Sequence, residues 1–322
     1  MSDPSSRPTV ILTEHLDPSA KEWIAICVRL LEAGSETPEF ELAIANAAGL
    51  IVRTYTRVDA ALLDRAPVLK VVGRAGVGLD NIDLAACRER NITVVSTPDG
   101  NTEAVVEYVF GLILDSVRPR ASMKERVAPD AFHRLRAGQV GRQLDRMTLG
   151  ILGVGRIGCR IAQAAGVFGM RTLASDIRGE RELALGPDWA GSVVDLVTLL
   201  SESDILTVHV DGRPSNRHLV DAEFLAGLKP ECLLINTSRG FVVDSTALAA
   251  WAKRVIERGG RAVLDVHDPE PPDASYPLWG LPNVRLLPHL ASRTDTAMAD
   301  MSGVVRDVVR VLAGEAPEWP AW

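Results

Sequence analysis

The fold is decided by the stretch Leu149-Gly150-Ile151-Leu152-Gly153-Val154-Gly155-Arg156-Ile157-Gly158, in which an apolar run leads into three glycines spaced G-x-G-x-x-G. Helical spacing follows from Arg160 onward. This order is typical of a dinucleotide-binding strand, turn and helix: the first glycine permits the turn, the second lets backbone approach a pyrophosphate, and the third lets the helix pack on the strand. The helix N-terminus adds unpaired N–H groups for the phosphates. We therefore predict cofactor contacts at Gly153, Gly155, Arg156, Ile157 and Gly158.

The acidic residue Asp176 follows the next apolar stretch. Its distance from the glycines is close to the roughly 20 residues that precede the ribose-binding acid in such units. A carboxylate at this place accepts hydrogen bonds from the adenosine ribose hydroxyls and repels a 2′-phosphate, so we predict NAD as the cofactor. The nearby Arg178 acts against this preference.

Length and composition limit the class of protein. The 322 residues exceed one ordinary core and suit two domains. A formal net charge of −7 argues against a nucleic-acid partner, because no basic excess exists to replace counterions. No apolar run approaches about 18 residues and the N-terminus has no apolar signal segment, so we expect no membrane partner and a cytoplasmic location. The four cysteines form no C-x-x-C pair and the histidines show no H-E-x-x-H spacing, so we predict no metal.

Short β-branched runs alternate with helical patterns along the chain, and this predicts βα units. Such units build parallel sheets with helices on both faces. The predicted fold class is α/β, with two doubly wound parallel-sheet domains. The strands are expected at Thr9–Leu12, Leu50–Val52, Leu69–Val72, Thr93–Val95, Thr148–Leu152, Arg171–Ala174, Ile205–Val208, Leu233–Asn236, Arg261–Asp265 and Val284–Leu287.

Three segments between and after these strands are distinctive. Residues 105–117 place their apolar side chains on one helical face, and Pro119 stops the helix. Residues 120–146 carry many charges with little periodicity, so we interpret them as a connector. Residues 301–312 form one apolar stripe, which indicates a single last helix.

Three strands behind the glycine motif each end in a polar cluster, over residues 236–240, 265–271 and 288–292. In an open parallel sheet ligands gather at the carboxyl ends of the strands, so the three clusters are expected to face one crevice. They supply Arg239, Glu270 and His289, which we call the trio.

The trio suits the reduction of a 2-keto acid by hydride. Imidazole is the side chain that exchanges protons near neutral pH, so His289 is the predicted proton donor. Glu270 would orient that imidazole and favour its protonated form. Arg239 offers a planar fork of donors to a carboxylate and the adjacent carbonyl. Each residue alone also fits an ordinary role, in a helix cap, a solvated turn or a loop, but their joint placement after three strands favours catalysis.

These motifs resemble those of the D-isomer-specific 2-hydroxyacid dehydrogenases. The likeness runs through residues 73–83, 153–158, 236–240, 264–271 and 288–289, and it covers nearly the whole chain. It implies a Rossmann-like, dinucleotide-binding domain over residues 119–290. It also implies a flavodoxin-like substrate domain that is discontinuous, over residues 1–118 plus 291–322, with the cleft between the two domains and a homodimer as the usual assembly.

The resemblance also implies roles for single residues. The trio would be catalytic, and a small 2-hydroxy or 2-keto acid would be the substrate. Asp265 would hold the nicotinamide carboxamide, while Thr237 and His209 would line the cofactor. The backbone amides near Ala75 and Gly76 would hold the substrate carboxylate.

One segment departs from the family pattern. After Val208 and His209 the relatives commonly read Pro-Leu-Thr, whereas this chain has Asp211-Gly212-Arg213. That loop runs near the cofactor phosphates in relatives. The extra carboxylate either weakens cofactor binding or points outward, and we favour the second interpretation.

Two arginines bear on the choice of substrate. The segments 51–54 and 71–76 are similar to those of 3-phosphoglycerate dehydrogenases. Arg53 and Arg74 follow neighbouring predicted strands and would bind a phosphate, so 3-phosphoglycerate and 3-phosphohydroxypyruvate are the predicted substrate pair. Alternatively these arginines balance nearby acids, and the chain is a hydroxypyruvate or glyoxylate reductase. Further arginines in the connector fit both alternatives: Arg134, Arg136 and Arg142.

A non-catalytic function is the alternative from a different class. Some relatives act as NAD-sensing transcriptional corepressors and keep the same trio, but this sequence shows no peptide-docking tail, so a non-catalytic role is less favoured. The chain ends at Trp322, without the C-terminal regulatory domain of serine-controlled relatives, so we expect no control by serine.

Overall fold

The computed structural model describes residues 7–118, 120, 122–179, 189 and 191–322. The chain divides into two compact units. Unit 1 comprises Met1–Asn101 and Ser292–Trp322, and unit 2 comprises Thr102–Ala291. Each unit is an α/β domain built on one parallel sheet, which confirms the predicted fold class.

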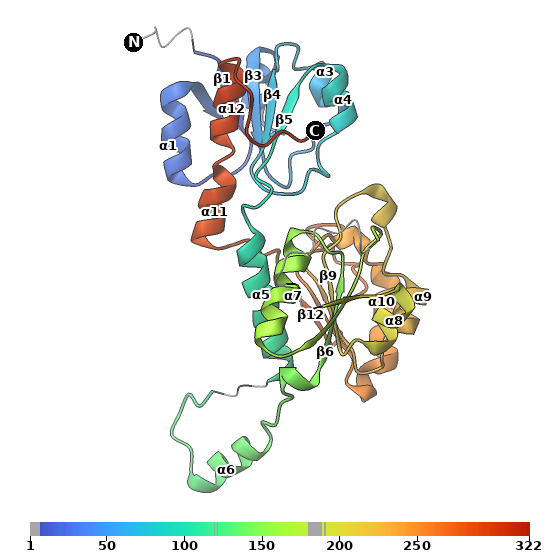
Figure 1. Ribbon diagram of the computed structural model, residues 1–322. Helices are drawn as coiled ribbons and strands as arrows, with labels where there is room; N and C mark the ends of the chain where they lie inside the picture. The colour runs from blue at the N-terminus through green and yellow to red at the C-terminus, as the bar shows by residue number, and fades with distance from the viewer. Residues whose placement is uncertain (1–6, 119, 121, 180–188, 190) are drawn as a thin grey trace. The chain divides into compact units, whose positions relative to one another are not determined.

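The sheet of unit 1 has five parallel strands in the order β2-β1-β3-β4-β5 (Figure 1). This is the flavodoxin-like order, and it reverses direction between β1 and β3. The strands are β1 Thr9–Leu12, β2 Arg29–Glu32, β3 Ala47–Val52, β4 Val71–Arg74 and β5 Thr93–Val95. The helices are α1 Pro18–Cys27, α2 Pro38–Ala43, α3 Ala60–Asp64, α4 Leu84–Glu89, α11 Asp295–Ser302 and α12 Val305–Leu312.

Both faces of this sheet are buried, because alternate strand residues enter two different cores. Ile11 of β1 packs with the helices α2, α3 and α4, whereas Val10 and Leu12 pack with α1 and α12. Close packing of α12 depends on a glycine in the sheet: a Cβ on Gly73 would collide with Val308. The C-terminal helix is therefore part of the core of unit 1.

The sheet of unit 2 has seven parallel strands in the order β12-β11-β10-β9-β6-β7-β8. Read from β8, this is the Rossmann order with one further strand, and its direction reverses between β6 and β9. The strands are β6 Thr148–Leu152, β7 Arg171–Ser175, β8 Ser192–Val193, β9 Ile205–Val208, β10 Leu233–Asn236, β11 Arg261–Leu264 and β12 Val284–Leu286. The helices are α5 Thr102–Val117, α6 Pro129–Ala137, α7 Arg156–Val167, α8 Leu196–Glu202, α9 Ala222–Gly227 and α10 Ser245–Val255.

Helices cover the two faces of this sheet as well. The helices α5 and α7 pack on one face, where Leu233 and Ile235 of β10 point. The helices α8, α9 and α10 pack on the other face, against Leu234 of the same strand. This explains why the central strands are continuous apolar runs rather than alternating ones.

The structure differs from the sequence-based expectations at five places. The strands β2 and β8 were not predicted, because both are short edge strands with no fully buried residue. The connector contains the helix α6, and the single last helix is two helices, α11 and α12, separated at Gly303. The helix α5 belongs to unit 2 rather than to the N-terminal domain, because it packs on α7; its expected stop, Pro119, lies outside the described residues.

Candidate active site

The trio follows three neighbouring strands of unit 2. Arg239 comes after β10, Glu270 after β11 and His289 after β12, and these strands lie side by side in the parallel sheet. Their carboxyl ends therefore share one edge. The strand order is the one that the sequence-based expectation of a shared edge requires.

The imidazole of His289 and the carboxylate of Glu270 are in direct contact. Nδ1 of His289 lies 2.6 Å from Oε1 of Glu270, and both side chains are about three-quarters buried. Burial raises the pKa of Glu270, but the hydrogen bond and charge of His289 outweigh it, and the net pKa is lowered. Glu270 is therefore an anion that fixes the ring through Nδ1, which leaves Nε2 as the ring nitrogen outside this contact.

Backbone contacts hold Glu270 and Arg239 in place. Oε2 of Glu270 accepts a hydrogen bond from the N–H of His267 at 3.3 Å. The amide of Asn236 donates to the carbonyl of Arg239 at 2.9 Å, while Nη1 of Arg239 donates to the carbonyl of Ser238 at 2.8 Å. The turn after β10 and the turn after β11 are thus each fixed by hydrogen bonds local to the site.

The carboxylate of Asp265 anchors the segment that follows β12. Its Oδ1 accepts from the N–H of Leu290 at 2.9 Å and from the hydroxyl of Tyr108 at 3.1 Å, and its Oδ2 accepts from the N–H of Ala291 at 2.8 Å. Asp265 is fully buried, and burial raises its pKa despite these bonds. His289 itself has a positive φ of 55°, a conformation that is uncommon for any residue but glycine and that the anchored segment maintains.

Sequence analysis did not identify Tyr108. It lies on the helix α5, far from Asp265 in the sequence, and a tyrosine on an apolar helical stripe gives no signal of its own. Burial is the first cause that raises its pKa, followed by the charge of Asp265.

The glycine motif has the geometry of a phosphate-binding turn. Gly153 has a φ of 94°, and Gly155 is the residue before the helix α7, whose first turn begins with Arg156 and Ile157. A Cβ on Gly158 would collide with the carbonyl of Gly153, so this glycine permits the helix to approach the turn. A Cβ on Gly155, by contrast, would meet no protein atom within 4 Å. Packing within the chain therefore does not require Gly155, whereas close approach of a ligand does.

Two further residues border this turn. The backbone carbonyl of His209 lies against Gly153. Nε2 of the His209 side chain lies 2.7 Å from Oγ1 of Thr207. Burial lowers the pKa of His209 to about 3, so the imidazole is neutral. Oγ1 of Thr237 is buried and has no hydrogen-bond partner among the described residues. Buried hydroxyls rarely lack a hydrogen-bond partner, so a polar atom of a bound ligand would complete the hydrogen bonding of Thr237.

The carboxylate of Asp176 forms hydrogen bonds and an ion pair within its own chain. It accepts hydrogen bonds from the N–H of Val154 at 2.7 Å and from the N–H of Arg178 at 3.0 Å, and it forms a bidentate ion pair with the Arg178 guanidinium at 2.9 and 3.0 Å. Burial raises the pKa of Asp176, but these bonds and the positive charge hold it at about 2. In the neighbouring loop Arg213 forms a bidentate ion pair with Asp211.

In unit 1 the arginines predicted to bind substrate have different surroundings. Arg74 is 9% exposed, and its Nη1 donates to the carbonyl of Ala75 at 3.1 Å. The expected role of two backbone amides needs correction: the N–H of Ala75 donates to the carbonyl of Val52, and the N–H of Gly76 donates to the carbonyl of Arg74, both at 2.9 Å. In this conformation the pairing of β4 with β3 uses the first amide and a tight turn uses the second, so neither is open to a carboxylate.

Arg53 lies at the point where the strand order of unit 1 reverses, directly after β3 and beside the end of β1. Its guanidinium contacts the carbonyl of His15 at 3.3 Å and Sδ of Met298 at 3.4 Å. Burial, and then the positive charge of Arg293, lower its pKa. No carboxylate of the described residues lies within 4 Å of this guanidinium.

The nearby carboxylate of Glu14 serves the backbone instead. It accepts hydrogen bonds from the N–H groups of residues 53–56 at 3.0 to 3.2 Å, which lower its pKa against the effect of burial. Glu14 and Arg293 were not predicted from sequence, since each is a single charged residue outside any motif.

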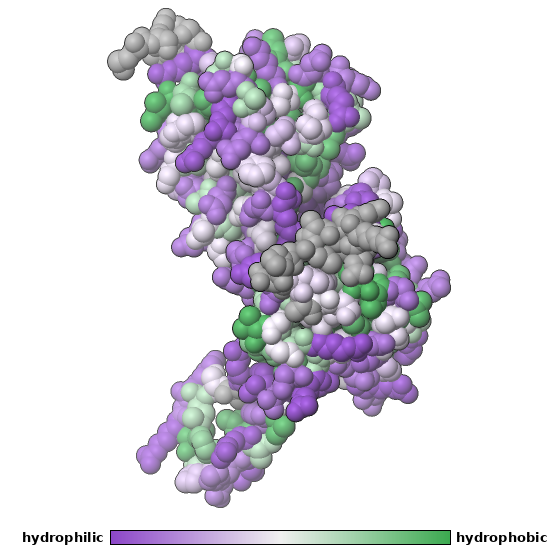
Figure 2. All heavy atoms as spheres, viewed as in Figure 1, coloured by the Kyte–Doolittle hydropathy of each residue, from purple (hydrophilic) through white to green (hydrophobic). Residues whose placement is uncertain are grey.

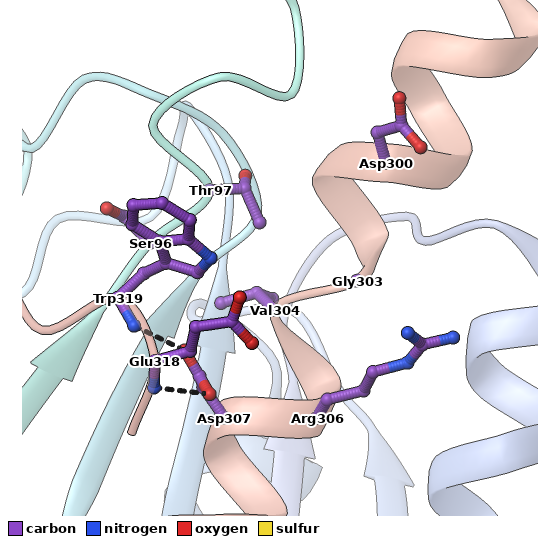
Figure 3. A pocket seen from close by; sticks show the side chains of 9 residues that line it. All are labelled: Ser96, Thr97, Asp300, Gly303, Val304, Arg306, Asp307, Glu318 and Trp319. Carbon is purple, nitrogen blue, oxygen red and sulfur yellow. Dashed lines mark hydrogen bonds between the residues drawn. The ribbon is translucent and has the colours of Figure 1, made fainter. Parts of the chain in front are cut away.

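A pocket of about 210 Å³ in unit 1 contains none of the predicted site residues (Figure 3). Asp307, which is 4% exposed, accepts hydrogen bonds there from the N–H groups of Glu318 and Trp319, both at 2.9 Å. The N–H of Ser96 donates to the carbonyl of Trp319, and Ala321 donates to Val94. Asp307 therefore fixes the C-terminal segment along β5, a structural role.

Within the described residues, no helix is long and apolar enough to span a membrane, and no three His, Cys, Asp or Glu side chains gather as metal ligands would.

Comparison with known proteins bears on the whole chain. A family model described as the NAD-binding domain of D-isomer-specific 2-hydroxyacid dehydrogenases matches residues 110–291. The chain is 40% identical to an (S)-sulfolactate dehydrogenase of Chromohalobacter salexigens, over 84% of this chain and 86% of that protein. It is 36% identical to a D-3-phosphoglycerate dehydrogenase of Synechocystis, over 82% of this chain but only 47% of that protein, so it spans about half the length of that relative.

The chain is also similar in fold to a solved structure of a reductase. The glyoxylate/hydroxypyruvate reductase of Sinorhizobium meliloti, a complex with NADP and malonate, superposes with a TM-score of 0.80 at 28% identity. The match covers 98% of this chain and 97% of the reductase.

Proposed function

The chain belongs to the D-isomer-specific 2-hydroxyacid dehydrogenases and is an NAD-dependent oxidoreductase of that family, and we propose that its substrate is a three-carbon D-2-hydroxy acid with a second anionic group at C3. 3-Phosphoglycerate, with its keto acid 3-phosphohydroxypyruvate, remains the leading candidate. The observation that carries the chemistry is the contact of His289 with Glu270, together with the strand order that puts Arg239 after the adjacent strand β10.

We propose the following roles for the trio. Bound NAD accepts or supplies the hydride at its nicotinamide ring. In reduction, His289 gives the proton on Nε2 to the carbonyl oxygen, while Glu270 holds Nδ1 and stabilises the positive charge of the ring. Arg239 binds the substrate carboxylate through its planar fork of donors. In oxidation, neutral His289 removes the hydroxyl proton.

Two features support the second anionic group. Ligands of doubly wound sheets bind where the strand order reverses, and Arg53 occupies that place in unit 1. It is electrostatically coupled to a second guanidinium, that of Arg293, and the carboxylate of Glu14 is used by backbone N–H groups. Two cations that form no ion pair with a carboxylate among the described residues are suited to a phosphate or a sulfonate.

The names of two relatives also support a second anionic group on the substrate. One acts on (S)-sulfolactate and one on D-3-phosphoglycerate. The two molecules share the same arrangement about C2, because sulfur raises the naming priority of the C3 branch above that of the carboxyl group. One site geometry therefore serves both, and the difference between them is a sulfonate or a phosphate.

Reduction of four keto acids by NADH tests this proposal. 3-Phosphohydroxypyruvate and 3-sulfopyruvate carry the second anion, whereas hydroxypyruvate and glyoxylate do not. We expect at least one of the first pair to exceed both of the second pair in kcat/KM, and the better of the two identifies the anion. Equal or better use of hydroxypyruvate or glyoxylate would establish the alternative reductase activity instead.

The variant Arg53→Gln locates the anion site. It should raise KM for the preferred substrate at least tenfold, with little change for glyoxylate, because a charge-assisted contact to the second anion is lost. Arg65→Gln is the matched control, since Arg65 pairs with Glu41 on the surface of the same unit. An unchanged KM in Arg53→Gln would remove this arginine from the site.

We also propose that the chain forms a homodimer through the arm at residues 122–143. The helix α6 in this arm extends away from the rest of unit 2, and none of its residues is buried (Figure 1). Apolar side chains are exposed along the arm (Figure 2): Met123, Val127, Phe132 and Val140. A helix without a buried face is marginal in water, and a second copy of the chain would bury this one.

Light scattering on size-exclusion fractions tests the assembly. The wild-type chain should elute as a dimer, and Phe132→Glu should shift it toward the monomer, because burial of a charge at the contact is costly. Leu42→Glu is the control, since Leu42 is exposed on α2 in unit 1. A wild-type monomer would refute the proposal.

A further inference from the structure

The ion pair of Arg178 with Asp176 occupies the carboxylate that was predicted to bind the ribose of NAD. An ionised carboxylate has about four lone-pair sites for hydrogen bonds. The Asp176 carboxylate receives four donors from its own chain: the N–H groups of Val154 and Arg178, and Nε and Nη2 of the Arg178 side chain. Its acceptor capacity is therefore filled. The ribose hydroxyls of NAD find no free acceptor here unless the guanidinium of Arg178 moves.

The guanidinium also bridges the carboxylate and the glycine turn. Nη2 of Arg178 donates to the carbonyl of Val154 at 3.0 Å as well as to Asp176. The side chain of Asp176 is 9% exposed, whereas that of Arg178 is 45% exposed. The group that solvent, or a ligand, meets at this place is thus the arginine rather than the carboxylate.

The unusual segment Asp211-Gly212-Arg213 adds a second arginine to the same neighbourhood. The hydrogen bond to Asp176 raises the pKa of Arg178, and the hydrogen bond to Asp211 raises the pKa of Arg213. The charge of Arg213 also acts on Arg178 and that of Asp176 on Arg213, so the two guanidinium groups share one electrostatic neighbourhood. Arg213 is held by Asp211, which is in turn bound by the Asn216 amide at 3.1 Å. Two arginines, each held by an aspartate two residues away, therefore follow β7 and β9, the two strands that flank β6 in the sheet.

We propose that Arg178, supported by Arg213, forms a 2′-phosphate subsite, so that this enzyme accepts NADP(H) as well as NAD(H). The 2′-phosphate of NADP pairs with the Arg178 guanidinium while Arg178 remains on Asp176, whereas NAD binds after Arg178 releases that carboxylate. An arginine near the ribose-binding position is the usual means of accepting a 2′-phosphate, and its planar fork suits phosphate oxygens. This inference rests on the proposed cofactor site but not on the choice of keto acid.

Titration of nicotinamide fluorescence without substrate tests the subsite directly. The wild-type enzyme should bind NADPH within about tenfold of NADH. Arg178→Ala should bind NADH about fivefold more tightly, because the Asp176 carboxylate becomes available at the loss of a half-exposed ion pair, and should bind NADPH about tenfold more weakly. Arg213→Ala should weaken NADPH binding alone, by a smaller factor.

Arg171→Ala is the matched control. Arg171 begins the same strand, β7, at its opposite end and pairs with Glu202 on the surface, so its loss should leave both dissociation constants unchanged. A ratio of NADPH to NADH affinity that stays within twofold of wild type in Arg178→Ala would overturn the proposal. Weaker NADH binding in that variant would overturn it too, since Arg178 would then support the turn rather than block the carboxylate. If the ratio shifts as expected but no 2-keto acid is reduced, only the proposed substrate fails.

Discussion

Replacing Asp265 by asparagine tests how the site is held in place. The asparagine has the same size, but one carboxylate oxygen becomes an NH₂ donor. If the NH₂ takes the place of Oδ2, it faces the N–H of Ala291; if it takes the place of Oδ1, it faces the N–H of Leu290 and the hydroxyl of Tyr108. The first orientation loses fewer bonds, so we expect it.

The magnitude follows from the contacts. One buried backbone N–H loses its acceptor, which costs about 1–3 kcal/mol, and the remaining bonds lose their charge assistance, about 1 kcal/mol more. Because Asp265 is fully buried, water does not replace the lost acceptor. The free energy of opening residues 289–291 should therefore fall by about 2–4 kcal/mol, which is a roughly 30- to 900-fold faster amide exchange.

Hydrogen exchange of a peptide that covers residues 287–292, followed by mass spectrometry, measures this opening. The kcat should fall at least tenfold in the same variant, because His289 lies in the loosened segment. Tyr108→Phe is the graded control: it removes a single hydrogen bond to the same carboxylate and should show a smaller change of both quantities.

One result would refute this reasoning. If Asp265→Asn loses activity while the exchange of residues 287–292 is unchanged, Asp265 acts on a bound ligand, as the family resemblance implies, and does not anchor the segment.

Further predictions concern the turn, the pH dependence and the C-terminal segment. Gly158→Ala should lower the free energy of unfolding of unit 2 by about 1–3 kcal/mol through overpacking, seen in urea denaturation, whereas Gly155→Ala has room and should keep the stability but lose NADH binding. Unfolded His209 takes up a proton near its ordinary pKa of 6.5, whereas burial lowers the pKa of the folded residue to about 3. The stabilisation by neutral His209 is therefore present above pH 6.5 and is lost as the pH falls toward 3; about 2 kcal/mol should disappear between pH 7 and 5, and His209→Gln should flatten that part of the curve. Asp307→Ala should cost about 2–3 kcal/mol in thermal unfolding and expose residues 318–322 to carboxypeptidase, because two backbone N–H groups lose their hydrogen bonds to a buried carboxylate; an unchanged digestion rate would contradict this role.

Much of the fold was accessible from sequence because its signals are local. Buried parallel strands are apolar runs, and all ten expected strands overlap observed strands of the two sheets; several of them, such as β6 and β10, have identical bounds. The missed elements lack such a signal. Strand β2 has only two apolar residues, and helix α6 has no buried face, so neither contributes to a core that a periodic pattern would reveal.

The domain boundary shows the same limit. The apolar stripe of α5 predicts a helix over 105–117, but periodicity does not state which sheet that stripe faces. The stripe packs on α7, and this contact assigns the helix to unit 2.

The sequence by itself determined the family, the two parallel sheets and the identities of the trio, because the glycine turn and the polar clusters at strand ends are contiguous along the chain. Only the tertiary structure decided which side chains form hydrogen bonds with one another: Glu270 with His289, Tyr108 with Asp265, and Arg178 with Asp176, the carboxylate that was expected to bind the ribose of NAD. The physical reason is that hydrogen-bond capacity is finite. Whether a polar group is open to a ligand depends on donors and acceptors that folding brings from elsewhere, and the pattern of the sequence does not contain them.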